Sequence, residues 1–182
     1  MKNGILTALS ILILLIIIPF ETVLSNNLNP LIFGFSFGIV NHKLFKHNFL
    51  TGLILTITFS YLAFFIGFFG LFGIGEIIKW ITDIFNLKSL NGDILILFSG
   101  LIASLILYLL FTKVYKKQNI KKGFLIMLAS YFLIPFIVLI TPFIFRNSRP
   151  NEFFVIYNLS WLLIVGFFLS FTLNFNRKTE NE

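Results

Sequence analysis

Long segments without any charged residue constrain this chain more than any other feature of its sequence. Six such intervals consist mostly of Ile, Leu, Phe and Val: 3–20, 22–42, 47–75, 94–112, 123–145 and 153–176. At about 1.5 Å per residue, an apolar helix of about 20 residues crosses the roughly 30 Å hydrocarbon layer of a bilayer. The sequence therefore predicts an all-α fold, a polytopic transmembrane helix bundle.

Composition agrees with a membrane environment. Hydrophobic residues make up 58% of the 182 residues, charged residues make up 12%, and the mean hydropathy is +0.97. Such a chain has too few polar residues to cover a soluble globule of this size. The net charge of +7 is spread over short loops and does not form a basic nucleic-acid-binding domain. The absence of cysteine excludes disulfides and thiolate chemistry.

The whole chain, 1–182, is predicted to form one integral membrane domain. Its expected spans are about 4–20, 28–42, 49–72, 94–112, 123–145 and 153–175, followed by a tail at 176–182. Leu31–Val40 is the weakest of them, since its apolar residues reach only about 16 Å. It either crosses as a short span or turns back as a re-entrant segment, which leaves five spans. The first helix also fits a signal peptide cleaved before Asn26, although we favour its retention as an anchor.

A polar helix is expected after the third span. Gly70, Gly73 and Gly75 predict the end of that span, because glycine weakens a helix. In residues 76–88, charged and amide side chains recur on one helical face, and isoleucines cover the other. This pattern predicts an amphipathic helix in the membrane interface, with Trp80 at the boundary between lipid and water.

The distribution of Lys and Arg predicts the orientation. With six spans, one side carries ten bases (Lys2, Lys43, Lys46, Lys113, Lys116, Lys117, Lys121, Lys122, Arg177 and Lys178) and the other carries four (Lys79, Lys88, Arg146 and Arg149). The positive-inside rule makes the ten-base side, which includes both termini, cytoplasmic. With five spans only Lys2 changes side. We therefore expect a multi-pass protein of a cell membrane, such as a bacterial inner membrane, with a cytoplasmic carboxyl terminus.

A stripe of small residues is the most regular signal within a span. It consists of Gly52, Thr56, Ser60, Ala63, Gly67 and Gly70, and we call it the small-residue face. These residues fall within an arc of about 80° and extend over about 27 Å. Small residues let helix backbones approach closely in lipid, where apolar burial does not drive association. The face predicts packing within one chain, or with a partner subunit or second copy.

Two shorter patterns of the same kind accompany this face. Gly34 and Gly38 form a GxxxG pair on the preceding segment, and a weaker patch follows at Gly100, Ala103 and Ser104. We expect Gly67→Leu to disrupt packing. Leu53→Phe, which lies on another face of the span, is expected to be tolerated.

Other features have both a structural and a functional interpretation. Pro135 and Pro142 predict a static kink in 123–145, or a hinge beside a transport path. Arg146 and Arg149 suit snorkelling at a helix end, or binding of an anionic lipid headgroup. The lysines of the Lys113–Lys122 loop also suit anionic headgroups, although membrane orientation explains them as well.

Residues typical of catalysis or metal binding are missing from the expected spans. His42 and His47 do not share a helix face and have no Cys or carboxylate beside them, so we predict no metal, no cofactor and no catalytic residue. The sequence favours a non-catalytic membrane subunit or accessory protein that packs with a partner through its small-residue helix faces. The alternative is a small transporter or permease component for a neutral, apolar or lipid-like solute. An intramembrane enzyme is favoured least.

Overall fold

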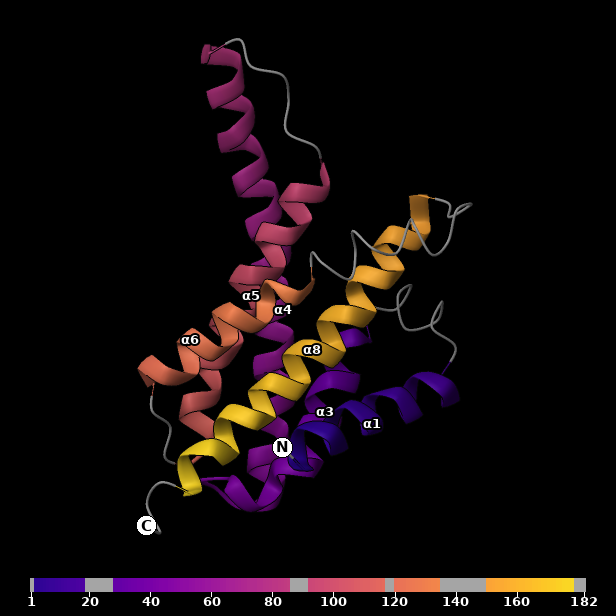
Figure 1. Ribbon diagram of the computed structural model, residues 1–182, viewed down its shortest axis with the longest axis vertical. Helices are drawn as coiled ribbons and strands as arrows, with labels where there is room; N and C mark the ends of the chain where they lie inside the picture. The colour runs from indigo at the N-terminus through magenta and orange to yellow at the C-terminus, as the bar shows by residue number, and fades with distance from the viewer. Residues whose placement is uncertain (1, 19–27, 86–91, 117–119, 135–149, 179–182) are drawn as a thin grey trace.

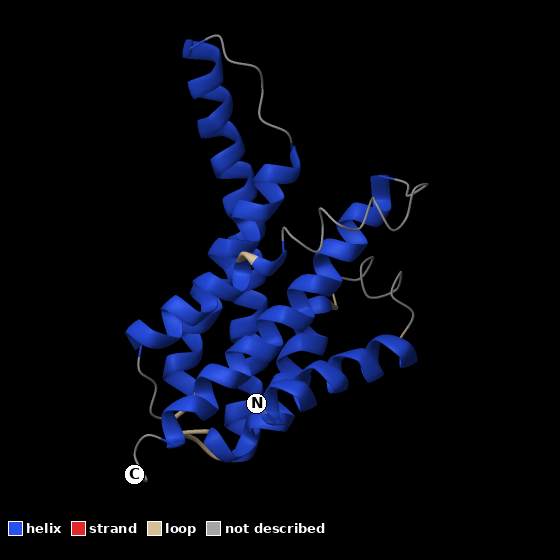
Figure 2. Ribbon diagram, viewed as in Figure 1, coloured by secondary structure: helices blue, strands red, loops and turns tan. Residues whose placement is uncertain are grey.

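Helices make up the fold. The computed structural model describes residues 2–18, 28–85, 92–116, 120–134 and 150–178, and this part of the chain contains helices and no strand (Figure 2). The helices are α1 (Lys2–Ile17), α3 (Asn29–Asn41), the short 3-10 helix η1 (His42–Leu44), α4 (Phe49–Phe85), α5 (Gly92–Val114), α6 (Ile120–Tyr131) and α8 (Pro150–Lys178). Each charge-free segment thus contains an α-helix, and the predicted all-α class is confirmed.

Local signals explain where several helices begin. Pro30 stands in the first turn of α3, where its missing N–H group is not needed for helical hydrogen bonds. α4 follows Asn48, whose Oδ1 atom accepts a hydrogen bond of 2.9 Å from the backbone N–H of Thr51. This side chain caps the helix by satisfying an N–H that has no partner within it. α8 begins at Pro150, again a residue suited to a first turn.

α4 corrects the prediction of a separate interfacial helix at 76–88. It runs without a break from Phe49 to Phe85, past all three glycines that were expected to end the span, and residues 86–88 lie outside the described part. A helical glycine costs about 1 kcal/mol relative to alanine, but it does not prevent helical dihedral angles. The sequence 70–85 contains no proline that would remove a backbone donor. The amphipathic residues therefore form the distal part of α4.

The short helix α3 lies in the middle of the bundle. It contacts α1, α4 and α8, and nine of its 13 residues are buried. α1 packs along α8, α5 packs along α4, and α6 packs against α5 and α8. In Figure 1, the upper end of α4 and the start of α5 reach past the other helices.

Aromatic rings fill the centre of the bundle near the end of α5. The ring centroid of Phe37 lies 4.9 Å from that of Phe111 and 5.4 Å from that of Tyr115. Phe45, in the loop before α4, lies 5.1 Å from Tyr115. Such tilted and edge-on pairs stabilise by about 0.5–1.5 kcal/mol beyond the area that they bury. They join α3, the 42–48 loop and α5 at one place.

The number of membrane crossings stays a prediction. Among the described residues, the helical segment Phe49–Gly67 is long and apolar enough to cross a membrane, by length and composition. The apolar helical stretches Lys2–Ile17, Ser99–Val114 and Tyr157–Leu173 are shorter. The expected span 123–145 is described only up to residue 134.

Candidate functional site

The first half of the small-residue face lies against α3. A Cβ atom at Gly34 would stand 2.7 Å from the Cα of Ile57 and 3.0 Å from the Oγ of Ser60. A Cβ at Gly38 would stand 2.7 Å from the Cδ1 of Leu53. The GxxxG pair therefore brings the backbones of α3 and α4 close together, as small residues do in membrane helix pairs.

Hydroxyl groups in this contact bond to one another and to the backbone. Thr56 Oγ1 donates to the Gly52 carbonyl at 2.7 Å and lies 2.9 Å from the hydroxyl of Tyr115. Because the Thr56 hydroxyl has a single proton, Tyr115 is the donor in that pair. Burial raises the pKa of the Tyr115 phenol, so its proton is retained. Ser60 Oγ donates to the Thr56 carbonyl at 2.8 Å, and the ring of Phe45 covers Gly52.

The second half of the small-residue face lies against α5. A Cβ at Gly67 would stand 2.7 Å from the Cβ of Ala103 and 3.1 Å from the carbonyl oxygen of Ser99. The contact loosens one turn later, since a Cβ at Gly70 would stand 4.0 Å from the Cδ1 of Ile102. One helix thus uses the same face to pack against two others.

Residues of the small-residue face are therefore in contact with helices of the same chain. Ala63, between the two contacts, is fully buried. The premise for Leu53→Phe is wrong, because Leu53 packs against Gly38 of α3; the effect of that substitution stays a prediction. Gly73 offers a better control, since a Cβ there would meet no atom of the described residues within 4 Å. A partner on this face stays a prediction.

A buried polar contact that the sequence did not reveal joins α1, α3 and α8. Asn41 Nδ2 donates to Ser170 Oγ at 2.9 Å and to the Phe37 carbonyl at 3.0 Å. Ser170 Oγ lies 2.8 Å from Thr7 Oγ1, which donates to the Asn3 carbonyl at 2.9 Å. Thr7, Asn41 and Ser170 are fully buried, and we call them the amide–hydroxyl cluster.

Hydrogen bonds in this cluster run in one direction. Each hydroxyl has one proton, so Asn41 donates to Ser170, Ser170 to Thr7, and Thr7 to the backbone of α1. Bonds arranged in such a chain strengthen one another. Asn41 stands at the end of the expected span 28–42, where a polar residue is ordinary, so its position gave no sign of this role. The available signal was the spacing of Asn3 and Thr7, which share a face of an otherwise apolar helix.

A second polar contact joins α5, α6 and α8. The indole Nε1 of Trp161 donates to the Gly100 carbonyl at 3.1 Å and to Ser104 Oγ at 3.0 Å. The hydroxyls of Tyr131 and Tyr157 lie 3.0 Å apart, and a Cβ at Gly100 would collide with the hydroxyl oxygen of Tyr157. The small residues predicted on α5 thus make room for aromatic side chains of α8.

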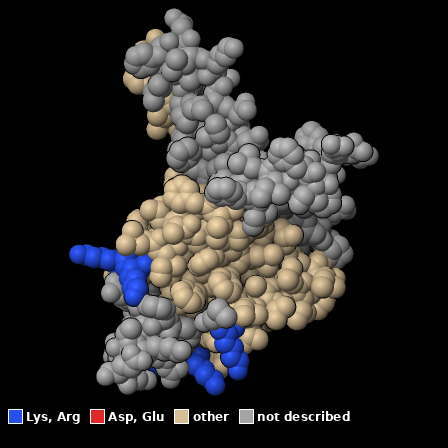
Figure 3. All heavy atoms as spheres, viewed as in Figure 1, with Lys and Arg blue, Asp and Glu red and all other residues tan. Residues whose placement is uncertain are grey.

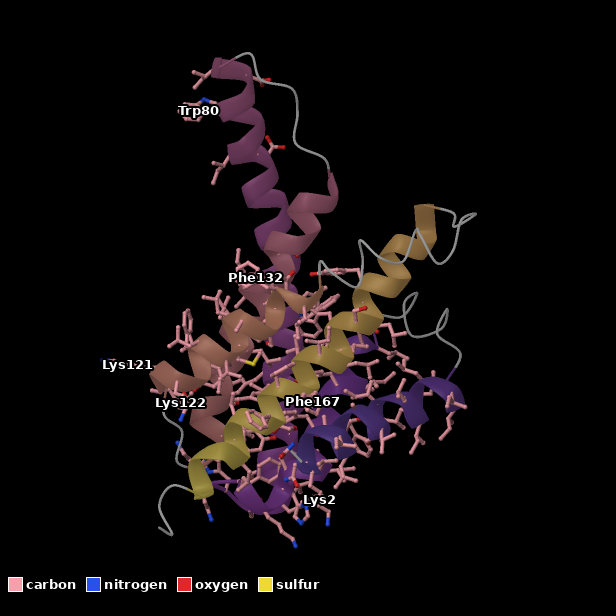
Figure 4. All side chains as sticks on the ribbon, in the orientation of Figure 1. Lys2, Trp80, Lys121, Lys122, Phe132 and Phe167 are labelled. Atoms are coloured by element: carbon pink, nitrogen blue, oxygen red, sulfur yellow. The ribbon has the colours of Figure 1, made fainter. Side chains whose placement is uncertain are left out.

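The exposed lysines of the face seen in Figure 3 lie at the left side and at the bottom of the molecule. In Figure 4, Lys2, Lys121 and Lys122 lie in the lower half, whereas Trp80 lies at the upper tip of α4. The exposed lysines with described side chains are Lys2, Lys43, Lys46, Lys113, Lys116, Lys121 and Lys122. Glu76 and Asp83 are exposed on the distal part of α4. Among the side chains that the structure describes, the lysines and the carboxylates therefore lie in different parts of the bundle.

Several residues that the sequence analysis singled out lie outside the part of the chain that the structure describes. Pro135, Pro142, Arg146 and Arg149 lie outside the described residues. His42 and His47 are exposed, and the described residues contain no group of three His, Cys, Asp or Glu side chains placed to hold a metal ion.

Comparison with protein-family models, curated proteins and solved structures gave no match. Function is therefore inferred from the contacts, burial and charge of the chain itself.

Proposed function

We propose that the chain is a multi-pass integral membrane protein whose outer surface contacts lipid. One observation carries this proposal: large apolar side chains are exposed, while hydroxyl and amide groups are buried. Exposed side chains such as Ile16 (83% exposed), Leu50 (65%) and Phe69 (67%) occur on α1, α3, α4, α5 and α6. Thr56 and Asn41 are fully buried. A soluble monomer rarely exposes so many large apolar side chains on so many helices.

The positions of the helix ends support six crossings over five. Asn3 donates to Asn41 Oδ1 at 3.3 Å, so the start of α1 and the end of α3 lie together. The 42–48 loop is hydrogen-bonded to residues 114 and 116 at the end of α5. A re-entrant α3 would instead require Lys2 and the 42–48 loop to be on opposite sides of the membrane. By the positive-inside rule, this shared lysine-rich end is cytoplasmic.

Within the membrane, we assign this bundle a non-catalytic role as a subunit or accessory protein. Its buried hydroxyl and amide groups bond mostly to each other and to carbonyls, which is what helix packing requires. Because α3 and α5 contact the small-residue face, we place a partner helix on a face that remains exposed. Helical spacing puts the exposed side chains of Phe69, Ile77, Trp80 and Ile84 on one side of the distal part of α4, and Figure 4 shows Trp80 near its upper tip.

Crosslinking in native membranes followed by purification in mild detergent tests this role. A photoreactive residue at Ile77 is expected to give one protein adduct of defined mass, and the untagged partner is expected to co-purify in fixed proportion. The matched control is Ile13 of α1, which is equally exposed at 56% against 59%. A lone stable monomer, with only lipid adducts from both positions, would contradict an accessory role.

The transporter alternative has one observation in its favour. Asn29 Oδ1 and Ser36 Oγ are buried and have no hydrogen-bond partner among the described residues. They stand seven residues apart on one face of α3, and an unpaired buried hydroxyl is costly. Because the chain lacks cysteine, a Ser36→Cys variant reports water access there without ambiguity. Reaction with a small polar thiol reagent would favour a solute path, and protection would favour the packing role.

A further inference from the structure

Two loops at the lysine-rich end are joined through their backbones. The N–H of Lys46 donates to the Val114 carbonyl at 2.8 Å, and the N–H of Lys116 donates to the Leu44 carbonyl at 2.8 Å. This is the pairing of antiparallel strands, with one bridge between the 42–48 loop and the end of α5. Segments far apart in the sequence are thereby fixed side by side.

Side chains on the inner side of this bridge anchor it in the bundle. Phe45 is 3% exposed and Tyr115 is fully buried, and the Tyr115 hydroxyl bonds to Thr56 of α4. On the outer side, Lys46 Nζ donates to the Thr112 carbonyl at 2.7 Å. This ammonium group therefore satisfies a carbonyl in the last turn of α5, where helical partners run out.

Four lysines are consequently held close together. Lys43, Lys46, Lys113 and Lys116 are all exposed and lie within or beside the bridge, and we call them the lysine platform. Lys46 pairs with Val114, the neighbour of Lys113, and Lys116 pairs with Leu44, the neighbour of Lys43. Residues 42–48 and 112–122 contain no Asp or Glu. The exposed carboxylate of Glu76 stands about 40 Å further along α4, and Asp83 lies beyond it, so neither of the carboxylates whose side chains the structure describes neutralises the platform.

Apolar side chains border the platform. Phe49, at the start of α4, is 52% exposed, and its ring centroid lies 6.5 Å from that of Phe45. Leu50 is 65% exposed, and Leu109, one turn before the end of α5, is 46% exposed. Positive charge next to exposed apolar side chains matches a molecule with an anionic head and a hydrocarbon tail, and matches a free anion or an acidic protein less well.

We propose that the lysine platform is a binding site for an anionic phospholipid of the cytoplasmic leaflet. The headgroup phosphate contacts Lys43, Lys113 and Lys116, and an acyl chain lies along Phe49, Leu50 and Leu109. Lys46 positions the site by tying the two loops together. This inference rests on the proposed membrane location, and it adds a lipid class and the residues that select it.

Native mass spectrometry of the full chain in mild detergent tests the site. With equal amounts of phosphatidylglycerol and phosphatidylcholine of the same acyl chains, the wild type is expected to retain mainly phosphatidylglycerol. Each lysine near an anionic surface contributes a factor of about five, so a Lys43→Gln, Lys113→Gln, Lys116→Gln variant should lose about a hundredfold of this preference at low salt. The corresponding triple Arg variant should keep it.

Control measurements separate this proposal from others. Lys79→Gln, Lys88→Gln, Arg146→Gln removes the same charge elsewhere and should leave the preference unchanged; an equal loss would overturn a defined site. Full displacement of the lipid by inorganic phosphate would indicate a free-anion site and overturn the lipid assignment. If the wild type resists carbonate extraction from membranes but binds both lipids equally, the lipid-site inference is rejected and the membrane proposal stands. Release by carbonate rejects the membrane proposal itself.

Discussion

Asn41 is the residue where three helices meet through polar groups. Its amide donates to Ser170 of α8 and to the backbone of α3, and its oxygen accepts from Asn3 of α1. Hydrogen bonds between membrane helices stabilise by about 0.6 kcal/mol on average and by up to about 1.7 kcal/mol. A residue that makes two such interhelical bonds therefore has an effect well above that of an ordinary packing contact.

We expect Asn41→Ala to lower the free energy of unfolding by about 1–2 kcal/mol. The substitution removes the first donor of the amide–hydroxyl cluster and leaves Ser170 and the Phe37 carbonyl without that partner. Titration with a denaturing detergent, followed by circular dichroism, measures the change.

The control for this variant is Ile39→Leu. Ile39 lies on the same helix and is 39% exposed, and its replacement by leucine keeps the side-chain volume. A change below about 0.5 kcal/mol is expected for such a surface position. Equal effects of both substitutions would show that the cluster contributes nothing specific.

At the scale of helices, α4 organises the bundle. Its small-residue face contacts α3 first and α5 further along, and its distal part extends beyond both α3 and α6 (Figure 1). Both contacts are close. At α3 a Cβ at Gly34 would meet the backbone of Ile57, and at α5 a Cβ at Gly67 would meet the side chain of Ala103 and the carbonyl oxygen of Ser99.

Gly67→Leu is expected to destabilise the fold by about 1–3 kcal/mol or more, because the added side chain has to displace Ala103. Gly73→Leu, on the same helix, is expected to be neutral or stabilising by up to about 1 kcal/mol, since leucine favours helix more than glycine does. Detergent titration of both variants distinguishes them. The helix contact would be refuted if Gly67→Leu were as well tolerated as Gly73→Leu.

Continuity of α4 predicts a long distance between spin labels at Ile54 and Ile84. Thirty residues of unbroken helix separate their backbones by about 45 Å, whereas a right-angle bend at the glycines shortens this to about 34 Å. Pulsed electron paramagnetic resonance on the reconstituted protein resolves the two values. Labels at Ile54 and Phe69 serve as the control, because their separation of about 22 Å is the same in both cases.

The sequence predicts the helices well because the signal for each one, a long apolar segment without charge, lies within the segment itself and needs no distant contact. It also predicts the faces on which Gly34 and Gly67 stand, since helical periodicity is local too. The end of α4 was missed because a glycine is only a weak stop signal in the absence of proline. The role of Asn41 was missed because it depends on α1 and α8, which are distant in sequence from α3 and which no local pattern brings together.

At the scale of the whole molecule, two distributions support a membrane bundle. Apolar side chains face outward on five helices, and exposed lysines gather at one end while the exposed Glu76 and Asp83 stand on the distal part of α4. A bilayer accounts for both, since it solvates the apolar sides and retains positive charge on the cytoplasmic face. The start of α1 also lies at the lysine-rich end. This position favours six crossings, because with five crossings the start of α1 would lie on the opposite side of the membrane from the 42–48 loop.

Single-cysteine labelling in intact cells measures this arrangement directly, because the chain has no cysteine of its own. Cysteines replacing Lys2, Lys43 and Lys116 are expected to react with a membrane-impermeant thiol reagent only after the cells are opened. A cysteine replacing Ser148, in the predicted outer loop, is expected to react in intact cells. If the cysteine at position 2 reacted in intact cells while those at 43 and 116 did not, the six-crossing bundle would be contradicted.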